Sequence, residues 1–87
     1  MDISIQTTID QFLQNISLTR SENTEKTYRN AMNAFIQMLK ESGIDPESSV
    51  DNLSEKIFSS YAKYLKAYSP STESLYINVA KNYFEFL

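Results

Sequence analysis

The chain has 87 residues, enough for one domain whose small core must be packed efficiently. It contains no Cys and no His, which excludes a disulfide framework, a thiolate metal site and the usual imidazole base or zinc ligand. A single Gly excludes Gly-rich phosphate loops and most hairpin turns. The chain shows neither a secretory signal nor an apolar run near the roughly 20 residues that span a bilayer. We therefore expect a soluble, cytoplasmic protein with no membrane partner.

The net charge of −3 is unusual for a nucleic-acid-binding protein, because such proteins gain affinity by neutralising phosphates. The charges are segregated along the sequence, however. Residues 26–40 and 56–66 carry only basic charges, and residues 41–55 carry only acidic ones. Such blocks can give one face a positive potential, although solvated helix faces explain them equally simply.

The first predicted helix has an apolar stripe with i, i+3, i+4, i+7 spacing and a cap at Thr7 or Thr8. A polar connector at 17–23 leads to a second helix over about 24–42, and Gly43 fits the left-handed position that ends many helices. The stripe residues of the two helices are Ile9, Phe12, Leu13, Ile16, Tyr28, Ala31, Met32, Phe35, Ile36, Met38 and Leu39.

An acidic loop at 44–52 precedes a third predicted helix, with Ser54 as its N-cap and Leu53 and Phe58 as a hydrophobic staple. Proline disfavours helix in the residue before it, so Ser69-Pro70 ends this helix. A fourth helix begins after Ser71. In the third helix the apolar positions expected to be buried are Ile57, Phe58, Tyr61 and Leu65, with Tyr68 as an optional extension of the stripe. In the fourth they are Leu75, Val79, Ala80, either Tyr83 or Phe84, and Leu87. Because the sequence stops within an apolar stripe, we expect a fragment of a longer protein.

An enzyme is difficult to assemble from these residues. Ser and Thr are plentiful, but there is no His to activate them, and the carboxylate pairs fall near helix ends, where capping is their ordinary role. We predict no catalytic residues, no metal site and no cofactor. Tyr28, Tyr61 and Tyr83 are predicted core residues whose hydroxyls reach the surface, while Tyr64, Tyr68 and Tyr76 are interpreted as lying off the stripes.

The polar faces of the second and fourth helices carry the functional signal. Ser, Thr and Asn can donate hydrogen bonds to phosphate oxygens, helix N-termini add backbone amides, and Lys and Arg supply positive charge. Capping plus a solvated surface is the simpler explanation for the same residues. The candidate DNA-binding residues are Lys26, Thr27, Arg29, Asn30, Ser71, Thr72, Ser74, Asn78 and Lys81.

The order of these features resembles a known family. A short apolar-striped helix precedes Ser21-x-x-Thr24-x-x-x-Tyr28, an acidic linker follows Gly43, and a Ser-Pro-Ser-Thr hinge opens the last helix. This order is similar to that of the N-terminal core-binding, SAM-like domain of tyrosine recombinases, the phage-integrase family. The resemblance covers residues 7–87.

The resemblance implies an all-α fold, a compact bundle of four or five helices that forms half of a clamp around a recombination core site. It implies that the catalytic residues lie in a second domain, that double-stranded DNA and other recombinase subunits are the partners, and that the second and fourth helices approach DNA. We expect the isolated chain to be monomeric. The alternative is a helical protein–protein interaction domain without nucleic-acid binding.

Overall fold

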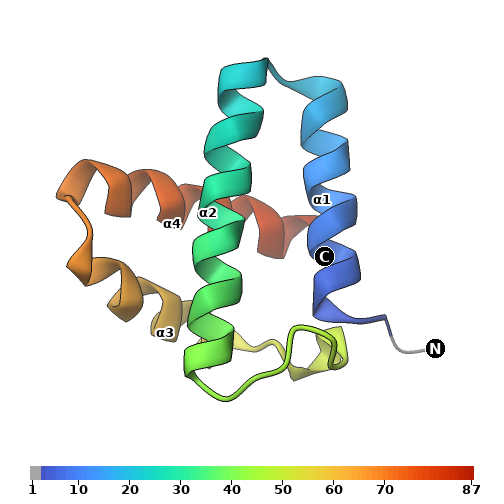
Figure 1. Cartoon of the computed structure of the whole chain (residues 1–87), viewed down its shortest axis with the longest axis vertical. Coiled ribbons are helices and arrows are strands. Elements are labelled where there is room, and N and C mark those ends of the chain that lie inside the picture. The colour runs from blue at the N-terminus through green and yellow to red at the C-terminus, as the bar shows by residue number, and fades with distance from the viewer. Residues whose placement is uncertain (1–2) are drawn as a thin grey trace.

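The predicted all-α fold is confirmed by a computed structural model, which describes residues 3–87 (Figure 1). Within this range the backbone forms four α-helices and two short 3₁₀ helices. Their bounds are α1 (Ile5–Thr19), α2 (Glu22–Glu41), η1 (Val50–Asn52), α3 (Glu55–Tyr64), η2 (Leu65–Ala67) and α4 (Pro70–Phe86).

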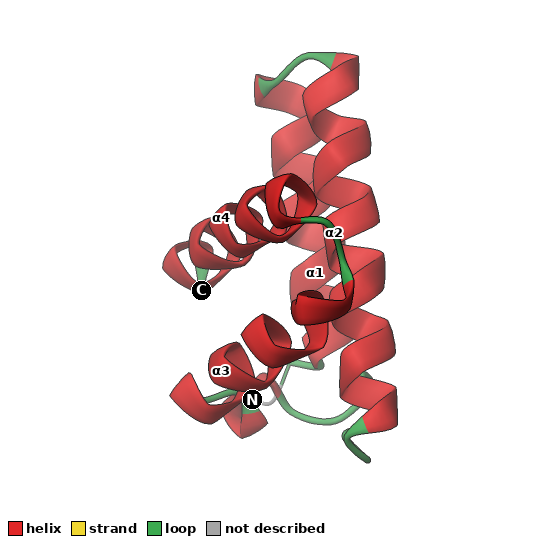
Figure 2. Cartoon of the chain, turned by 90° about the vertical axis from the view of Figure 1, so that its left-hand side faces the viewer, coloured by secondary structure: helices red, strands yellow, loops and turns green. Residues whose placement is uncertain are grey.

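The helices form two layers. α1 and α2 lie side by side and antiparallel, and α4 crosses behind them with α3 below it (Figures 1 and 2). α4 packs against α1, α2 and α3, and α3 packs against α2, so both helices of the second layer contact the first. The crossing leaves the N-terminal half of α2 standing above α4.

The apolar stripes predicted from the sequence form the core. Ile9, Phe12, Leu13 and Ile16 of α1 are buried. In α2 the predicted residues Ala31, Met32, Phe35, Met38 and Leu39 are buried, and Tyr28 and Ile36 are half-buried. Two predicted core residues of the last helix are not buried, because Leu75 is 47% exposed and Leu87 is 51% exposed. Since α4 crosses its neighbours instead of lying along them, only a narrower line of its surface is covered, at Val79, Ala80 and Tyr83.

The first helix begins earlier than the sequence pattern predicted. Ser4 is its N-cap, with its Oγ accepting from the backbone N–H of Thr7 at 3.0 Å, so the predicted cap at Thr7 or Thr8 is wrong. The loop after α2 supplies the remaining acceptors. The N–H groups of Ile5 and Gln6 donate to the carbonyls of Ser48 and Pro46 at 2.9 and 2.8 Å. Together with the Thr8 N–H bond to the Ser4 carbonyl, these bonds satisfy the first four amides of α1.

The predicted polar connector at 17–23 is also wrong, because α1 continues to Thr19 and α2 starts at Glu22. The hydroxyls of Ser17 and Thr19 donate back to carbonyls in the preceding turn, at 2.7 and 2.9 Å. This back-bonding lets polar residues remain helical. At the other end of α2, Gly43 has φ +80°, which confirms the predicted left-handed position.

The α3–α4 connection differs from the prediction in detail. Ser54 is the N-cap of α3, as predicted, but its side chain makes no capping hydrogen bond. α3 tightens into η2 after Tyr64, and Tyr68 is 37% exposed, so it does not extend the buried stripe. α4 then begins at Pro70, earlier than predicted, because proline fits the first helical position and Ser69 caps it.

Two buried tyrosines fasten the layers together through their hydroxyls. Tyr61 of α3 donates to the carbonyl of Ala31 at 2.7 Å, and Tyr83 of α4 lies 2.7 Å from the Thr8 hydroxyl of α1. The prediction that these hydroxyls reach the surface is therefore wrong. Burial raises the pKa of both phenols above its ordinary value, so both stay neutral around pH 7.

Candidate nucleic-acid interface

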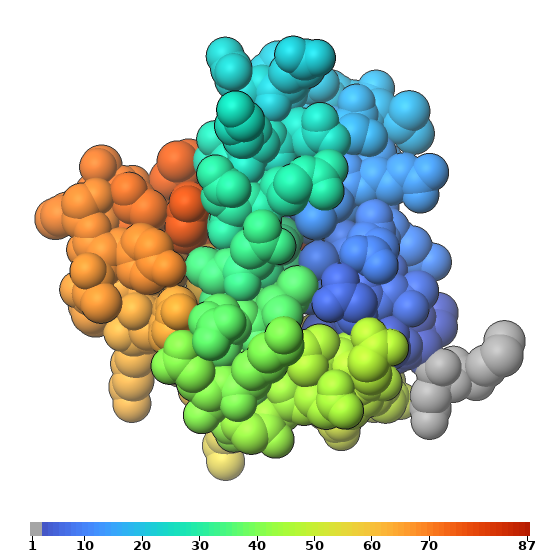
Figure 3. Space-filling view, viewed as in Figure 1, coloured from blue at the N-terminus to red at the C-terminus, as the bar shows by residue number. Residues whose placement is uncertain are grey.

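The nine candidate residues lie on the outer faces of α2 and α4, as their positions in the sequence predicted. Seven of them are exposed, and Thr27 and Thr72 are half-buried. In the space-filling view, the N-terminal half of α2 stands at the top of the molecule and α4 emerges at its left, with a step in the outline between them (Figure 3). The candidates therefore occupy two neighbouring faces instead of one flat surface.

One hydrogen bond ties the two faces together. The side-chain amide of Asn82 on α4 donates to the Tyr28 hydroxyl on α2 at 2.7 Å. Because a helix turns about 100° per residue, Ser71 and Asn78 lie within about 40° of Asn82, on the side of α4 that meets α2. Ser74 and Lys81 lie about 80° and 100° from Asn82 around the helix axis, on a side of α4 that does not face α2. Thr72 lies about 80° from Asn82 in the opposite sense and is half-buried, so the five α4 candidates do not share one face.

Two of the α2 candidates, Thr27 and Arg29, lie on opposite sides of Tyr28. Thr27 lies on one side, where its hydroxyl donates to the Asn23 carbonyl at 3.2 Å. Arg29 lies on the other side, where its Nη2 pairs with Glu25 Oε2 at 2.9 Å. A shallow hollow there is lined by Glu22, Glu25, Lys26 and Arg29. Two acids and two bases share this hollow, so the α2 bases do not form a purely positive patch.

The helix openings differ in the backbone amides that they offer. In α1, the loop and Ser4 occupy the first four amides. At the starts of α2 and α4, the Ser21 and Ser69 hydroxyls accept from Thr24 and Thr72 at 3.3 and 3.4 Å. Within residues 3–87, the amides of the two residues before each of these threonines have no acceptor, apart from Pro70, which has no N–H. Free amides at a helix start, where the dipole is positive, suit an anion such as a phosphate.

The opening of α4 is the less acidic of the two. Its one first-turn acid, Glu73, is paired with Lys66 of η2, with Nζ and Oε2 3.1 Å apart. The opening of α2 has two first-turn acids, and only Glu25 is paired with a base, Arg29, which leaves the charge of Glu22 unpaired within the described residues. A phosphate therefore meets less repulsion at the start of α4.

The sequence interpretation missed two contributors to this surface. Asn82 continues the line of Ser71 and Asn78 on α4, and a search for polar residues at i+4 and i+11 could have found it. Lys66 lies outside both candidate helices. Only the folded η2 brings it to the start of α4, so no local pattern signalled it.

Two features are absent from the described part of the chain. No three His, Cys, Asp or Glu side chains gather there to hold a metal ion. No helix within residues 3–87 is long and apolar enough to cross a membrane.

A comparison with protein-family models matched residues 9–87 to the phage integrase, N-terminal SAM-like domain. This match includes every candidate residue of both helices. Comparison with curated proteins and with solved structures returned no match.

Proposed function

Because the chain belongs to the phage integrase N-terminal SAM-like domain family, we propose that it is a non-catalytic DNA-binding module that clamps duplex DNA at a recombination core site. Such domains are typically the core-binding domains of tyrosine recombinases. The catalytic domain is not in this chain, so the cleavage chemistry lies outside it. The family match over residues 9–87 is the observation that carries the proposal.

The geometry supports this proposal in two ways. The exposed polar residues of α2 and α4 lie on adjoining faces held together by Asn82 and Tyr28. Hydroxyl and amide donors of this kind, with free amides at the helix starts, are suited to phosphate oxygens. We therefore assign the DNA contacts to the nine candidates, with Asn82 as a positioning residue between the helices.

The charges set the strength of binding. Lys26 and Arg29 share their hollow with two acids, and Lys81 is the remaining base among the nine candidates. Since affinity for DNA depends largely on phosphate neutralisation, we expect the isolated chain to bind duplex weakly and to lose binding as salt is added. In a complete recombinase, a second DNA-binding domain and neighbouring subunits would contribute the rest of the affinity.

The test is a titration of the chain with duplex DNA at low salt, followed by backbone amide chemical shifts. We expect the shifts to lie on α2 and α4 and to fade with added salt. The double substitution Lys26→Glu and Lys81→Glu should leave the fold intact and weaken binding about tenfold or more, because both residues are exposed.

A matched control is Lys56→Glu with Lys63→Glu. It changes the net charge equally, at two exposed positions on α3. If the control weakens binding as much as the α2–α4 variant, the effect comes from net charge and the assigned surface is wrong. If no amide shifts appear at the highest duplex concentration, the chain does not bind DNA on its own.

A further inference from the structure

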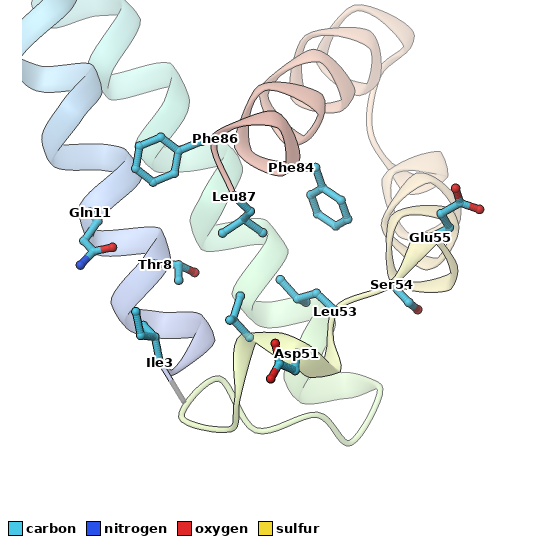
Figure 4. Close-up of a pocket in the computed structure, with 11 residues that line it drawn as sticks. Ile3, Thr8, Gln11, Asp51, Leu53, Ser54, Glu55, Phe84, Phe86 and Leu87 are labelled. Carbon is cyan, nitrogen blue, oxygen red and sulfur yellow. The ribbon is translucent and has the colours of Figure 1, made fainter. Parts of the chain in front are cut away.

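A groove opens at the end of the molecule where α1 begins and α4 ends. It has a volume of about 670 Å³ and lies between α1, the segment from Val50 to Glu55 and the last residues of α4 (Figure 4). None of the nine candidate DNA-binding residues lines it. The groove is therefore separate from the proposed DNA surface.

The floor of the groove is apolar and incompletely covered. Ile3, Phe86 and Leu87 line it and are 42%, 41% and 51% exposed. They are three of the six large hydrophobic residues that are exposed in the described chain. Val50, Leu53 and Phe84, which are half-buried, complete the apolar lining. Covering such side chains would remove apolar surface from water, which favours association.

The rim of the groove is acidic. Asp51 and Glu55 line it, and no Lys or Arg does. Both are exposed and belong to the stretch 41–55, which carries five acids and no bases. An occupant with apolar residues on one side would cover the apolar floor, and basic residues beside them would pair with the acids of the rim.

We propose that this groove docks a basic amphipathic helix of a partner protein. The apolar face of that helix would cover Leu53, Phe86 and Leu87, and its Lys or Arg residues would lie beside Asp51 and Glu55. A second copy of this chain fits less well, because none of its exposed large hydrophobic residues shares a helix with two exposed lysines. The proposal does not depend on DNA binding.

The probe is the peptide acetyl-KLLKKLLKKLLK-amide, added to the chain while backbone amide shifts are recorded. We expect shifts confined to the groove residues. The double substitution Asp51→Lys and Glu55→Lys should weaken binding about tenfold, since it turns two attractions into repulsions. Leu87→Glu should weaken binding similarly, and its exposed position leaves the fold intact, as thermal melting would verify.

Two matched controls separate the groove from general attraction. Glu22→Lys with Glu25→Lys makes the same charge change on α2, and Leu18→Glu changes an 80% exposed leucine of α1 outside the groove. Both should change binding less than about twofold. Equal losses in the controls, or equal binding of acetyl-ELLEELLEELLE-amide, would overturn the proposal.

Three further outcomes bear on the docking proposal. Peptide shifts located outside the groove would contradict the proposal. Groove shifts that grow with protein concentration, in the absence of peptide, would show that a second copy fills the site. Loss of DNA binding with retained peptide binding would remove the proposed function and leave this inference standing.

Discussion

The openings of α2 and α4 share one capping geometry but differ in their charges. Ser21 and Ser69 each accept a hydrogen bond from the amide three residues later, at 3.3 and 3.4 Å. Of the two first-turn acids of α2, Glu25 is paired with Arg29 and Glu22 is in no ion pair within the described residues, whereas the single acid of the α4 opening is paired with Lys66. A shared capping motif therefore does not make equivalent anion sites. The neighbouring side chains decide whether a phosphate is attracted.

The largest expected effect is on stability, and it comes from removing the side chain that packs α4 against the rest of the molecule. Tyr83 is fully buried and bonded to Thr8, so Tyr83→Ala should lower the free energy of unfolding by about 3–5 kcal/mol. Tyr83→Phe should cost about 1 kcal/mol, because the Thr8 hydroxyl keeps its bond to the Ile5 carbonyl. Urea unfolding followed by circular dichroism measures both. Equal losses would mean that the hydroxyl pair, and not the packing of the ring, holds α4.

The next effect concerns the contact between α2 and α3, where the Tyr61 hydroxyl donates to the Ala31 carbonyl. Burial, reinforced by the neighbouring tyrosines, raises the pKa of Tyr61 above its ordinary value of 10.0. The folded state then retains a proton that the unfolded state loses. The stability linked to the Tyr61 proton is therefore fully present below about pH 10. Above that pH, ionisation of this residue in the unfolded state should lower the free energy of unfolding by about 1.4 kcal/mol per pH unit.

Urea unfolding at a series of alkaline pH values would measure this slope. Tyr61→Phe should reduce the slope, with Tyr83 supplying the remainder, since burial raises its pKa as well. An unchanged slope in Tyr61→Phe would show that this phenol ionises equally in both states.

Removing the two capping hydroxyls compares how much each cap contributes to stability. Ser21→Ala should cost about 1 kcal/mol of stability, as expected for a lost N-cap. Ser69→Ala should cost less, because Pro70 already fixes the backbone of the first helical residue. Thermal unfolding of the two variants side by side is sufficient. A larger loss for Ser69→Ala would contradict the role given to Pro70.

The smallest effect tests the charge difference itself. Glu25→Gln removes an acid and releases Arg29, so the affinity for duplex DNA should rise about two- to threefold at low salt. Glu47→Gln makes the same charge change at an exposed loop position and should change affinity less. Fluorescence anisotropy with labelled duplex measures both. Equal gains would mean that net charge, rather than the local pair, limits binding.

The sequence predicted the fold well where a stripe of apolar residues was sufficient evidence. Phe12, Phe35 and Val79 are buried as their spacing indicated. The predictions were wrong where a distant partner decides the outcome. Ser4-x-x-Thr7 repeats the local pattern of the Ser21 and Ser69 caps, but the acceptors for the Ile5 and Gln6 amides lie in the loop after α2, which no local pattern indicated.

The same limit applies to the candidate interface. The exposure of Lys26 or Asn78 follows from helical periodicity, and the structure agrees. The pairing of Glu25 with Arg29 at i+4 was within reach of the sequence. The direction in which each α4 residue faces depends on how α4 crosses α2, and the exposure of Leu75 shows that stripe analysis did not capture that crossing.

The backbone bonds between the start of α1 and the loop after α2 have a consequence for folding order. Ile5 and Gln6 donate to carbonyls 43 and 40 positions away in the sequence, and Val50 donates to the Ile3 carbonyl at 2.8 Å. The first turn of α1 is thus completed only when α2 and the loop have formed. Its amide protons should exchange with solvent as slowly as those of the core, instead of fraying as helix ends ordinarily do. α1, α2 and the loop would then unfold as one cooperative unit.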